Sequence, residues 1–242
     1  MREAGGGSRP GRARGGPVRP VEERPVRILV DGADPLTLTA SPGGLEELAA
    51  GHLLARGVTA EALREATFRV AGSTVRVALP ASAAGRPAVD AVLREHLRAG
   101  GVAHVPACPE CASRLRRGRA APPSAARLRA VMAALLDGGA GVHGAALVGD
   151  DGVVHTVEDV GRHAAVDRVV GAALLRSWDP AALGLATTAR ISGEMSYKAA
   201  RAGFAWVASR SVPTTLAVAI AALVDLPIVA RAGSPRARSF GP

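Results

Sequence analysis

The feature that most constrains the fold is a regular alternation of short apolar runs and longer amphipathic stretches in the second half of the chain. The short runs have the length of strands and the longer stretches have the length of helices. The expected elements are a helix at 124–139, a hairpin at 143–159, helices at 162–177, 193–203 and 213–224, and strands at 183–189, 206–211 and 227–231. This order predicts an α/β fold in which helices cover both faces of a largely parallel or mixed sheet.

The first hundred residues show a different pattern. The expected elements are a strand at 26–32, a helix at 41–57 capped by Ser41, a hairpin at 67–79 and a helix at 88–98. They predict a smaller N-terminal α+β lobe over 26–100. Residues 1–25 are rich in Gly, Arg and Pro without periodic apolar positions, which is typical of a disordered basic tail.

Residues 101–123 contain the only two cysteines, Cys108 and Cys111, in the sequence ACPECASRLRRGR. Prolines and glycines interrupt this segment, so we expect a mobile loop between the lobe and an α/β ligand-binding domain at 124–242. Positive charge lowers the pKa of a nearby thiol by stabilising the thiolate. We expect that effect from the arginines that follow the pair, which are Arg114, Arg116, Arg117 and Arg119.

A thiolate in this segment could accept sulfane sulfur as a persulfide, with Cys108 as the carrier and Cys111 as a relay or resolving thiol. Three other interpretations remain open at this point. His104 and the two cysteines could contribute to a zinc site, although zinc requires about four ligands. The CxxC pair could instead be a thioredoxin-like redox motif, or it could have no function.

Charge and composition exclude some classes of protein. The formal net charge of +9 comes mainly from three Arg-rich segments, 1–27, 108–129 and 226–242, and Lys198 is the only lysine. Aromatic residues make up 2% of the chain, which leaves few stacking platforms and argues against a single-strand nucleic-acid binder. We expect no nucleic-acid partner. No signal peptide and no apolar run of about 18 residues appears, so we expect a cytoplasmic protein without a membrane segment.

The densest polar cluster is HTVEDVGRHAAVDR, residues 155–168. Arg162 and His163 lie at the expected start of a helix, where free backbone N–H groups can bind an anion. Glu158 and Asp159 precede them, but Glu158 and Arg162 could equally form an ordinary cap and ion pair. His143 is either a ligand-facing residue or a core histidine. A deaminase-type zinc site is disfavoured because the cysteines precede an HxxE sequence, the wrong order and spacing.

Two further polar turns, 187–195 and 209–216, each follow an expected strand and lead into an expected helix. Their candidate residues are Ser192, Ser211 and Thr214. Turns at the same edge of a sheet would form a pocket suited to a phosphorylated ligand. Ser and Thr are also the ordinary N-cap residues of helices, so this alternative stays open.

The order of the motifs resembles one known family. CPEC, GVHGAAL, EDVGRHAAVDRVVG, ARISGEMSYKAARAG and SRSVPTTLAV follow one another as in the FdhD family, the formate dehydrogenase accessory sulfurtransferases. The resemblance covers roughly residues 25–230. This chain departs from the family's pattern at Ala112, Ala164, Ala189 and Gly193.

The resemblance implies a fold and a function. The fold would be a three-layer α/β/α arrangement similar to cytidine deaminases, in a homodimer. The protein would take persulfide sulfur from a cysteine desulfurase and transfer it to the molybdenum cofactor, a bis(molybdopterin guanine dinucleotide), that formate dehydrogenase requires. Cys108 and Cys111 would be catalytic, and no metal site of the protein's own is expected.

The cofactor, bound as a substrate, would contact a set of residues at the ends of the second-half strands. They are His143, Glu158, Asp159, Arg162, His163, Ser192, Ser211, Thr214, Arg231, Gly233 and Arg236. Two alternatives to a sulfur carrier remain, a molybdenum-cofactor chaperone without sulfur chemistry and a CxxC thiol-disulfide protein.

Overall fold

A six-stranded mixed sheet forms the centre of the second half of the chain. The computed structural model describes residues 20–31, 33–80, 90, 91, 94, 95, 97, 101–136 and 141–241. The strands are β5 (His143–Gly149), β6 (Gly152–Asp159), β7 (Gly184–Thr187), β8 (Trp206–Ser209), β9 (Ile228–Ala230) and β10 (Arg238–Phe240), in the spatial order β10-β9-β8-β7-β5-β6. The β7, β8 and β9 strands are parallel, whereas β5, β6 and β10 pair antiparallel to their neighbours.

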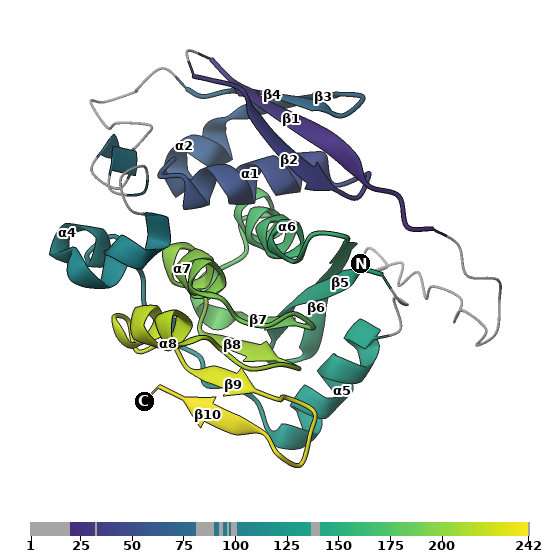
Figure 1. Ribbon diagram of the computed structural model, residues 1–242, viewed down its shortest axis with the longest axis vertical. Helices are drawn as coiled ribbons and strands as arrows, with labels where there is room; N and C mark the ends of the chain where they lie inside the picture. The colour runs from purple at the N-terminus through teal and green to yellow at the C-terminus, as the bar shows by residue number, and fades with distance from the viewer. Residues whose placement is uncertain are drawn as a thin grey trace, which may run out of the picture.

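Helices cover both faces of this sheet, so the predicted α/β architecture is confirmed (Figure 1). One face carries α6 (Arg162–Leu175), α7 (Gly193–Ala202) and α8 (Thr215–Ala222), and the other carries α5 (Ala125–Leu136). The inner strands β7, β8 and β9 are buried at every position, as expected for strands covered on both faces. The predicted likeness to cytidine deaminases remains an expectation.

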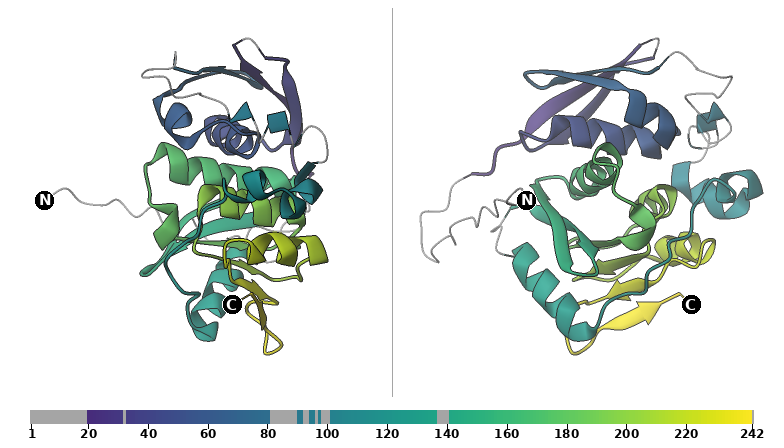
Figure 2. Two further views of the ribbon diagram at one scale, coloured as in Figure 1. Left: turned by 90° about the vertical axis from the view of Figure 1, so that its left-hand side faces the viewer. Right: turned by 180° about the vertical axis from the view of Figure 1, so that it is seen from behind.

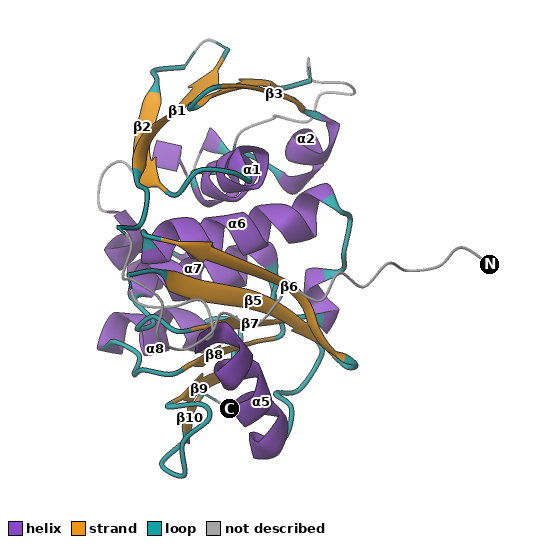
Figure 3. Cartoon of the chain, turned by 90° about the vertical axis from the view of Figure 1, so that its right-hand side faces the viewer, coloured by secondary structure: helices purple, strands orange, loops and turns teal. Residues whose placement is uncertain are grey.

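The N-terminal lobe places a second sheet above two helices, as the views from the sides and from behind make clear (Figures 2 and 3). Its strands β1 (Arg24–Val30), β2 (Leu36–Ala40), β3 (Thr67–Ala71) and β4 (Thr74–Ala78) have the order β2-β1-β4-β3. Helices α1 (Leu45–Ala55) and α2 (Ala60–Glu65) lie between this sheet and α6. Of the expected helix at 88–98, the structure describes residues 90, 91, 94, 95 and 97, and the last four of these are helical. Most of the expected tail at 1–25 lies outside the described residues.

The α1 and α6 helices cross at two glycines. A Cβ on Gly51 of α1 would lie 1.9 Å from the carbonyl oxygen of Asp167, and one on Gly171 of α6 would lie 1.9 Å from that of Glu47. The two backbones therefore approach more closely than side chains would allow. As a result α6 is buried along most of its length and joins the lobe to the main sheet.

Some local expectations were wrong. The N-cap of α1 is Gly44 in a left-handed conformation, and Ser41 binds the main domain instead: its hydroxyl accepts a hydrogen bond from Val160 N at 3.1 Å. The short elements α2, β2 and β10 were not expected, because each has too few residues to establish a periodic pattern.

Candidate functional site

The first part of the cysteine segment, residues 101–112, is mostly helical and not irregular as its sequence suggested, whereas residues 115–123 have no regular structure. A 3-10 helix, η2 (Gly101–Ala107), is followed by one turn of α-helix, α4 (Pro109–Ala112), with Cys108 as its N-cap. Pro109 occupies the first helical turn, where its missing N–H costs no hydrogen bond. The proline that suggested a break in regular structure therefore begins the helix. In Figure 1 this segment lies beside α7 and α8.

Both thiols are buried and lie against each other. Cys108 is 3% exposed and Cys111 is 0% exposed, and their sulfur atoms are 2.7 Å apart without a disulfide bond. The backbone N–H of Cys111 donates to Cys108 Sγ at 3.2 Å, the hydrogen bond expected of an N-cap acceptor. This donor can accommodate negative charge on the sulfur of Cys108.

The expected electrostatic activation does not apply to Cys111. Its pKa is raised to about 12, first by burial and then by the neighbouring Cys108 and Glu110, while Arg114 only partly opposes the shift. The arginines of the segment instead form ion pairs with other parts of the chain. The pairs are Arg114 with Asp90, Arg116 with Glu61, Arg117 with Asp225 and Arg119 with Asp179.

A zinc site is not supported by this geometry. Among the described residues, no group of three or more His, Cys, Asp or Glu side chains could hold a metal ion, and this includes His104 with the two cysteines.

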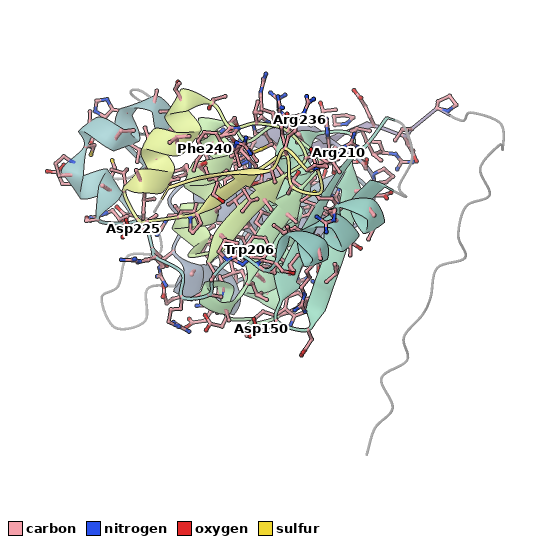
Figure 4. The ribbon with its side chains drawn as sticks, turned by 90° about the horizontal axis from the view of Figure 1, so that it is seen from below. Asp150, Trp206, Arg210, Asp225, Arg236 and Phe240 are labelled. Atoms are coloured by element: carbon pink, nitrogen blue, oxygen red, sulfur yellow. The ribbon has the colours of Figure 1, made fainter. Side chains whose placement is uncertain are left out.

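A second candidate site lies at one edge of the main sheet. The carboxyl ends of β7, β8 and β9 meet the first residue of β5 and the last of β6, because β5 runs antiparallel to β7. His143 and Asp159 are register partners at this edge. Figure 4 shows Arg210 and Arg236 at this edge, with Asp150 at the opposite end of the sheet. We call this edge the strand-end site.

Five guanidinium groups near the strand-end site have no ion-pair partner among the described residues. They belong to Arg162, Arg190, Arg210, Arg231 and Arg236. Arg231 has a left-handed backbone, φ 50°, held by hydrogen bonds of 2.8 Å from Arg231 N to Ser211 O and from Ala232 N to Ser209 O. Unpaired guanidinium groups at a sheet edge favour phosphate-bearing ligands.

Arg190 and Arg210 were not among the sequence candidates. The signal that could have identified them is their position, since Arg210 directly follows β8 and Arg190 follows β7 by three residues. Both are exposed.

Two helices start at this edge without a side-chain cap. The N-cap residue of the 14-residue α6 is Gly161, which has no side chain to cap the helix. The N-cap residue of the 10-residue α7 is Ser192, whose hydroxyl accepts no capping hydrogen bond. Thr214, in contrast, caps α8 by accepting from Ala217 N at 3.2 Å. The N-cap alternative therefore applies to Thr214, and the N–H groups of α6 and α7 can face an anion.

The predicted acidic residues have different positions. Asp159 is buried, and its carboxylate accepts hydrogen bonds from Arg168 Nε at 2.7 Å and Gly161 N at 2.8 Å. It therefore holds the first turn of α6 in place from inside the protein. Glu158 is exposed, and it forms neither a cap nor an ion pair with Arg162, so that alternative was wrong.

Other candidates are arranged around the same edge. His163 Nε2 lies 3.4 Å from Ser192 Oγ, which brings the α6 and α7 starts together. Ser211 N donates to Ser209 Oγ at 2.9 Å. Gly233 has φ 88° and packs against Met132 of α5, so it shapes the backbone after β9.

A buried ionic chain leads from His163 into the N-terminal lobe. Lys198 Nζ lies 3.0 Å from Glu194 and 2.8 Å from Asp167, and Asp167 accepts from or pairs with His52 of α1 at 3.2 Å. Glu194 also lies 3.5 Å from His163. The Lys198 ammonium lowers the pKa of both carboxyl groups against the opposing effect of burial. Sequence reasoning missed this chain because its members come from three separate helices.

The two candidate sites lie near opposite ends of α7. Ser192 begins the helix at the strand-end site, and near its other end Ala200 O accepts from Arg116 N of the cysteine segment at 2.8 Å. A helix of ten residues is about 15 Å long. The hydrogen bond to Ala200 therefore places Arg116, five residues after Cys111, at the end of α7 away from the strand-end site.

One departure from the family's pattern has a steric explanation. A Cβ on Gly193 would lie 2.6 Å from the Leu216 side chain, so α7 and α8 pack closely at this position.

Comparisons with known proteins identify similar sequences over most of the chain. The model of the FdhD/NarQ family matches residues 21–241. "Sulfur carrier protein FdhD" of Chromobacterium violaceum is 34% identical over 224 residues, which cover 84% of this chain and 81% of that protein. The protein of the same name in Mycobacterium tuberculosis is 34% identical over 238 residues, covering 86% and 84%.

A solved structure has the same fold. It is described as that of a proposed formate dehydrogenase accessory protein from Desulfotalea psychrophila, with a TM-score of 0.72, 23% identity, and coverage of 91% of this chain and 87% of that one. No helix in the described part of the chain is both long and apolar enough to cross a membrane.

Proposed function

The chain belongs to the FdhD/NarQ family, and on that premise we propose that it is a sulfur carrier for the maturation of formate dehydrogenase. It accepts sulfur from a cysteine desulfurase and passes it to the molybdenum cofactor, a bis(molybdopterin guanine dinucleotide), which it binds as a substrate. As the family resemblance implies, it acts in the cytoplasm as a homodimer. The observation that carries the proposal is the buried thiol pair, 2.7 Å apart, in a chain of this family.

Loading is a transfer of sulfane sulfur to Cys108. The Cys108 thiolate attacks the outer sulfur of the desulfurase persulfide, the sulfur–sulfur bond breaks, and the desulfurase thiolate leaves. The product is a persulfide on Cys108, and no net oxidation occurs. Cys108 is the carrier because it is the N-cap residue whose sulfur accepts a backbone hydrogen bond.

Release uses Cys111 as the resolving thiol. Its sulfur attacks the Cys108 sulfur, hydrosulfide leaves with both electrons of the broken bond, and a Cys108–Cys111 disulfide forms. A thiol reductant then restores the pair. The pKa of Cys111, raised to about 12 by burial, keeps this thiol protonated in the closed conformation. The closed segment would therefore retain the persulfide until it opens.

The strand-end site is the proposed cofactor site. Each guanine dinucleotide arm has a pyrophosphate, and the unpaired Arg162, Arg190, Arg210 and Arg231 and the starts of α6 and α7 provide donors for it. Because Cys108 and Cys111 are 3% and 0% exposed, the cysteine segment has to move for sulfur to reach the cofactor. The predicted mobility of 101–123 is part of this proposal.

Complementation of formate dehydrogenase tests the proposal. In a strain without its accessory factor, we expect the wild-type chain to restore formate dehydrogenase activity and Cys108→Ala to give only background activity. Arg210→Gln, which alters the other site, should reduce the activity and retain sulfur loading. Full activity with Cys108→Ala would contradict a carrier and support the chaperone alternative.

A further inference from the structure

A small cavity lies where the N-terminal lobe, α6, α7 and the cysteine segment meet. Its volume is about 40 Å³, and its lining combines apolar side chains from α1 and α6 with three arginines, Arg64, Arg116 and Arg201. We call it the seam cavity. It is separate from the strand-end site, because Arg201 lies in the last turn of α7 and the strand-end site lies at its first.

Arg201 is a buried cation, 7% exposed, with no ion-pair partner among the described residues. Its Nη1 donates to Arg114 O at 3.2 Å, but its Nε has no hydrogen-bond partner. Burial is the largest cause that lowers its pKa, and the Asp90 and Glu61 carboxylates, which form no ion pair with it, only partly oppose this effect. A buried charge that lacks a partner is strongly destabilising, which indicates that a ligand supplies the missing negative charge.

The other two arginines increase the positive charge of this cavity. Arg116 pairs only loosely with Glu61, at 3.7 Å, and both side chains are more than half exposed, so this pair is weak. Arg64 forms no ion pair with a described residue. Asp90 is engaged with Arg114 at 2.6 Å. Leu54, Val170 and Leu174 form the apolar part of the wall, where a charge interaction is screened less than in water.

From the unpaired Arg201 and the size and charge of the seam cavity, we propose that it binds a small inorganic oxyanion of the sulfate and phosphate class. One ordered water requires roughly 10–15 Å³ of such volume, so the cavity has room for a few heavy atoms but not for a nucleotide. Guanidinium groups match the geometry of tetrahedral oxyanions.

Occupancy of the seam cavity would also hold the cysteine segment closed. The segment is tied to α7 by Arg116 N to Ala200 O at 2.8 Å and by Arg201 Nη1 to Arg114 O. An anion between the Arg116 and Arg201 guanidinium groups adds a third link. This inference does not depend on sulfur transfer or on cofactor binding.

Calorimetric titration of the full chain with sulfate, at constant ionic strength, tests the proposal. We expect saturable binding that weakens at least about tenfold in Arg201→Met, the loss of charge-assisted hydrogen bonds. Arg129→Gln, on α5 across the main sheet, is the matched control and should retain the affinity. Arg210→Gln should retain it as well, which separates the seam cavity from the strand-end site. Equal affinity in wild type and Arg201→Met would overturn the proposal.

Two further measurements keep the test decisive if Arg201→Met fails to fold. The double variant Arg64→Gln/Arg116→Gln changes only exposed side chains and should also weaken sulfate binding. In crystals grown with selenate, anomalous scattering should locate selenium beside Arg201. Absence of selenium from the seam cavity when it occupies the strand-end site would overturn the proposal.

Discussion

Arginine has two roles in this chain, and the distinction depends on partners that the sequence does not reveal. The arginines after Cys111 are each paired with an acidic residue from another element, whereas those after β7, β8 and β9 have no such partner among the described residues. The sequence predicted the strand-end arginines Arg162, Arg231 and Arg236 as ligand contacts. It overestimated the effect of the arginines near the thiols on Cys111, where Arg114 lowers the pKa but burial outweighs it.

His163 provides a test at this scale. Burial lowers its pKa below the ordinary 6.5, Lys198 and Arg162 act in the same direction, and Glu194 and Asp167 oppose them. A bound pyrophosphate would favour the protonated imidazole, so binding takes up a proton. We expect guanosine diphosphate to bind more tightly at pH 6 than at pH 8, by up to about tenfold for a pKa shift of about one unit.

The control is His163→Gln, in which this pH dependence should disappear. Calorimetry at both pH values makes the comparison. In the free protein the same group affects folding stability, with the opposite dependence on pH. Because the folded state disfavours the protonated imidazole, the free energy of unfolding is higher above about pH 6.5 and decreases as the pH falls below it. An unchanged pH dependence in His163→Gln would exclude this residue from the anion site.

At the scale of elements, the periodic segments were predictable and the short ones were not. Helices α5 to α8 and strands β5 to β9 all lie where the alternation predicted them, because each buries a face or a whole run of apolar residues. The cysteine segment was misjudged because its prolines suggest a loop, yet Pro109 is compatible with the first turn of α4. Burial of the thiols depends on contacts with distant elements, which no local pattern contains.

The close crossing of α1 and α6 predicts that Gly51→Ala destabilises the protein, the opposite of its effect in an isolated helix. In an isolated helix, Gly→Ala stabilises by up to about 1 kcal/mol. At Gly51 the added Cβ would lie 1.9 Å from Asp167 O, so the helices must separate. We expect Gly51→Ala to lower the free energy of unfolding by about 3 kcal/mol, measured by urea denaturation. A stabilised variant would contradict the close crossing.

Gly72→Ala is the control for that measurement. Gly72 has φ 58° in the β3–β4 turn, and a Cβ added there would have no other atoms within 4 Å, so only backbone strain applies. The expected loss is about 1 kcal/mol.

At the scale of the whole molecule, the two predicted halves share one hydrophobic core. Val26 and Ile28 of the lobe belong to the same buried cluster as Ile228 of the main sheet, and so do both cysteines. Ser41, Asp159 and Arg168 join the halves by buried polar contacts. Exposure of the thiols therefore requires the cysteine segment to separate from this core, which connects sulfur transfer to a conformational change.

The most direct test of the account is the mass of the tryptic peptide 99–114, which contains both cysteines. After incubation with a cysteine desulfurase and cysteine, we expect this peptide to gain one sulfur atom that a thiol reductant removes. Cys108→Ala should abolish the gain, and Cys111→Ser should retain it for longer than wild type, since no thiol remains to resolve the persulfide. A chain that gains no sulfur, or gains it equally in Cys108→Ala, would contradict the central claim that Cys108 carries the sulfur.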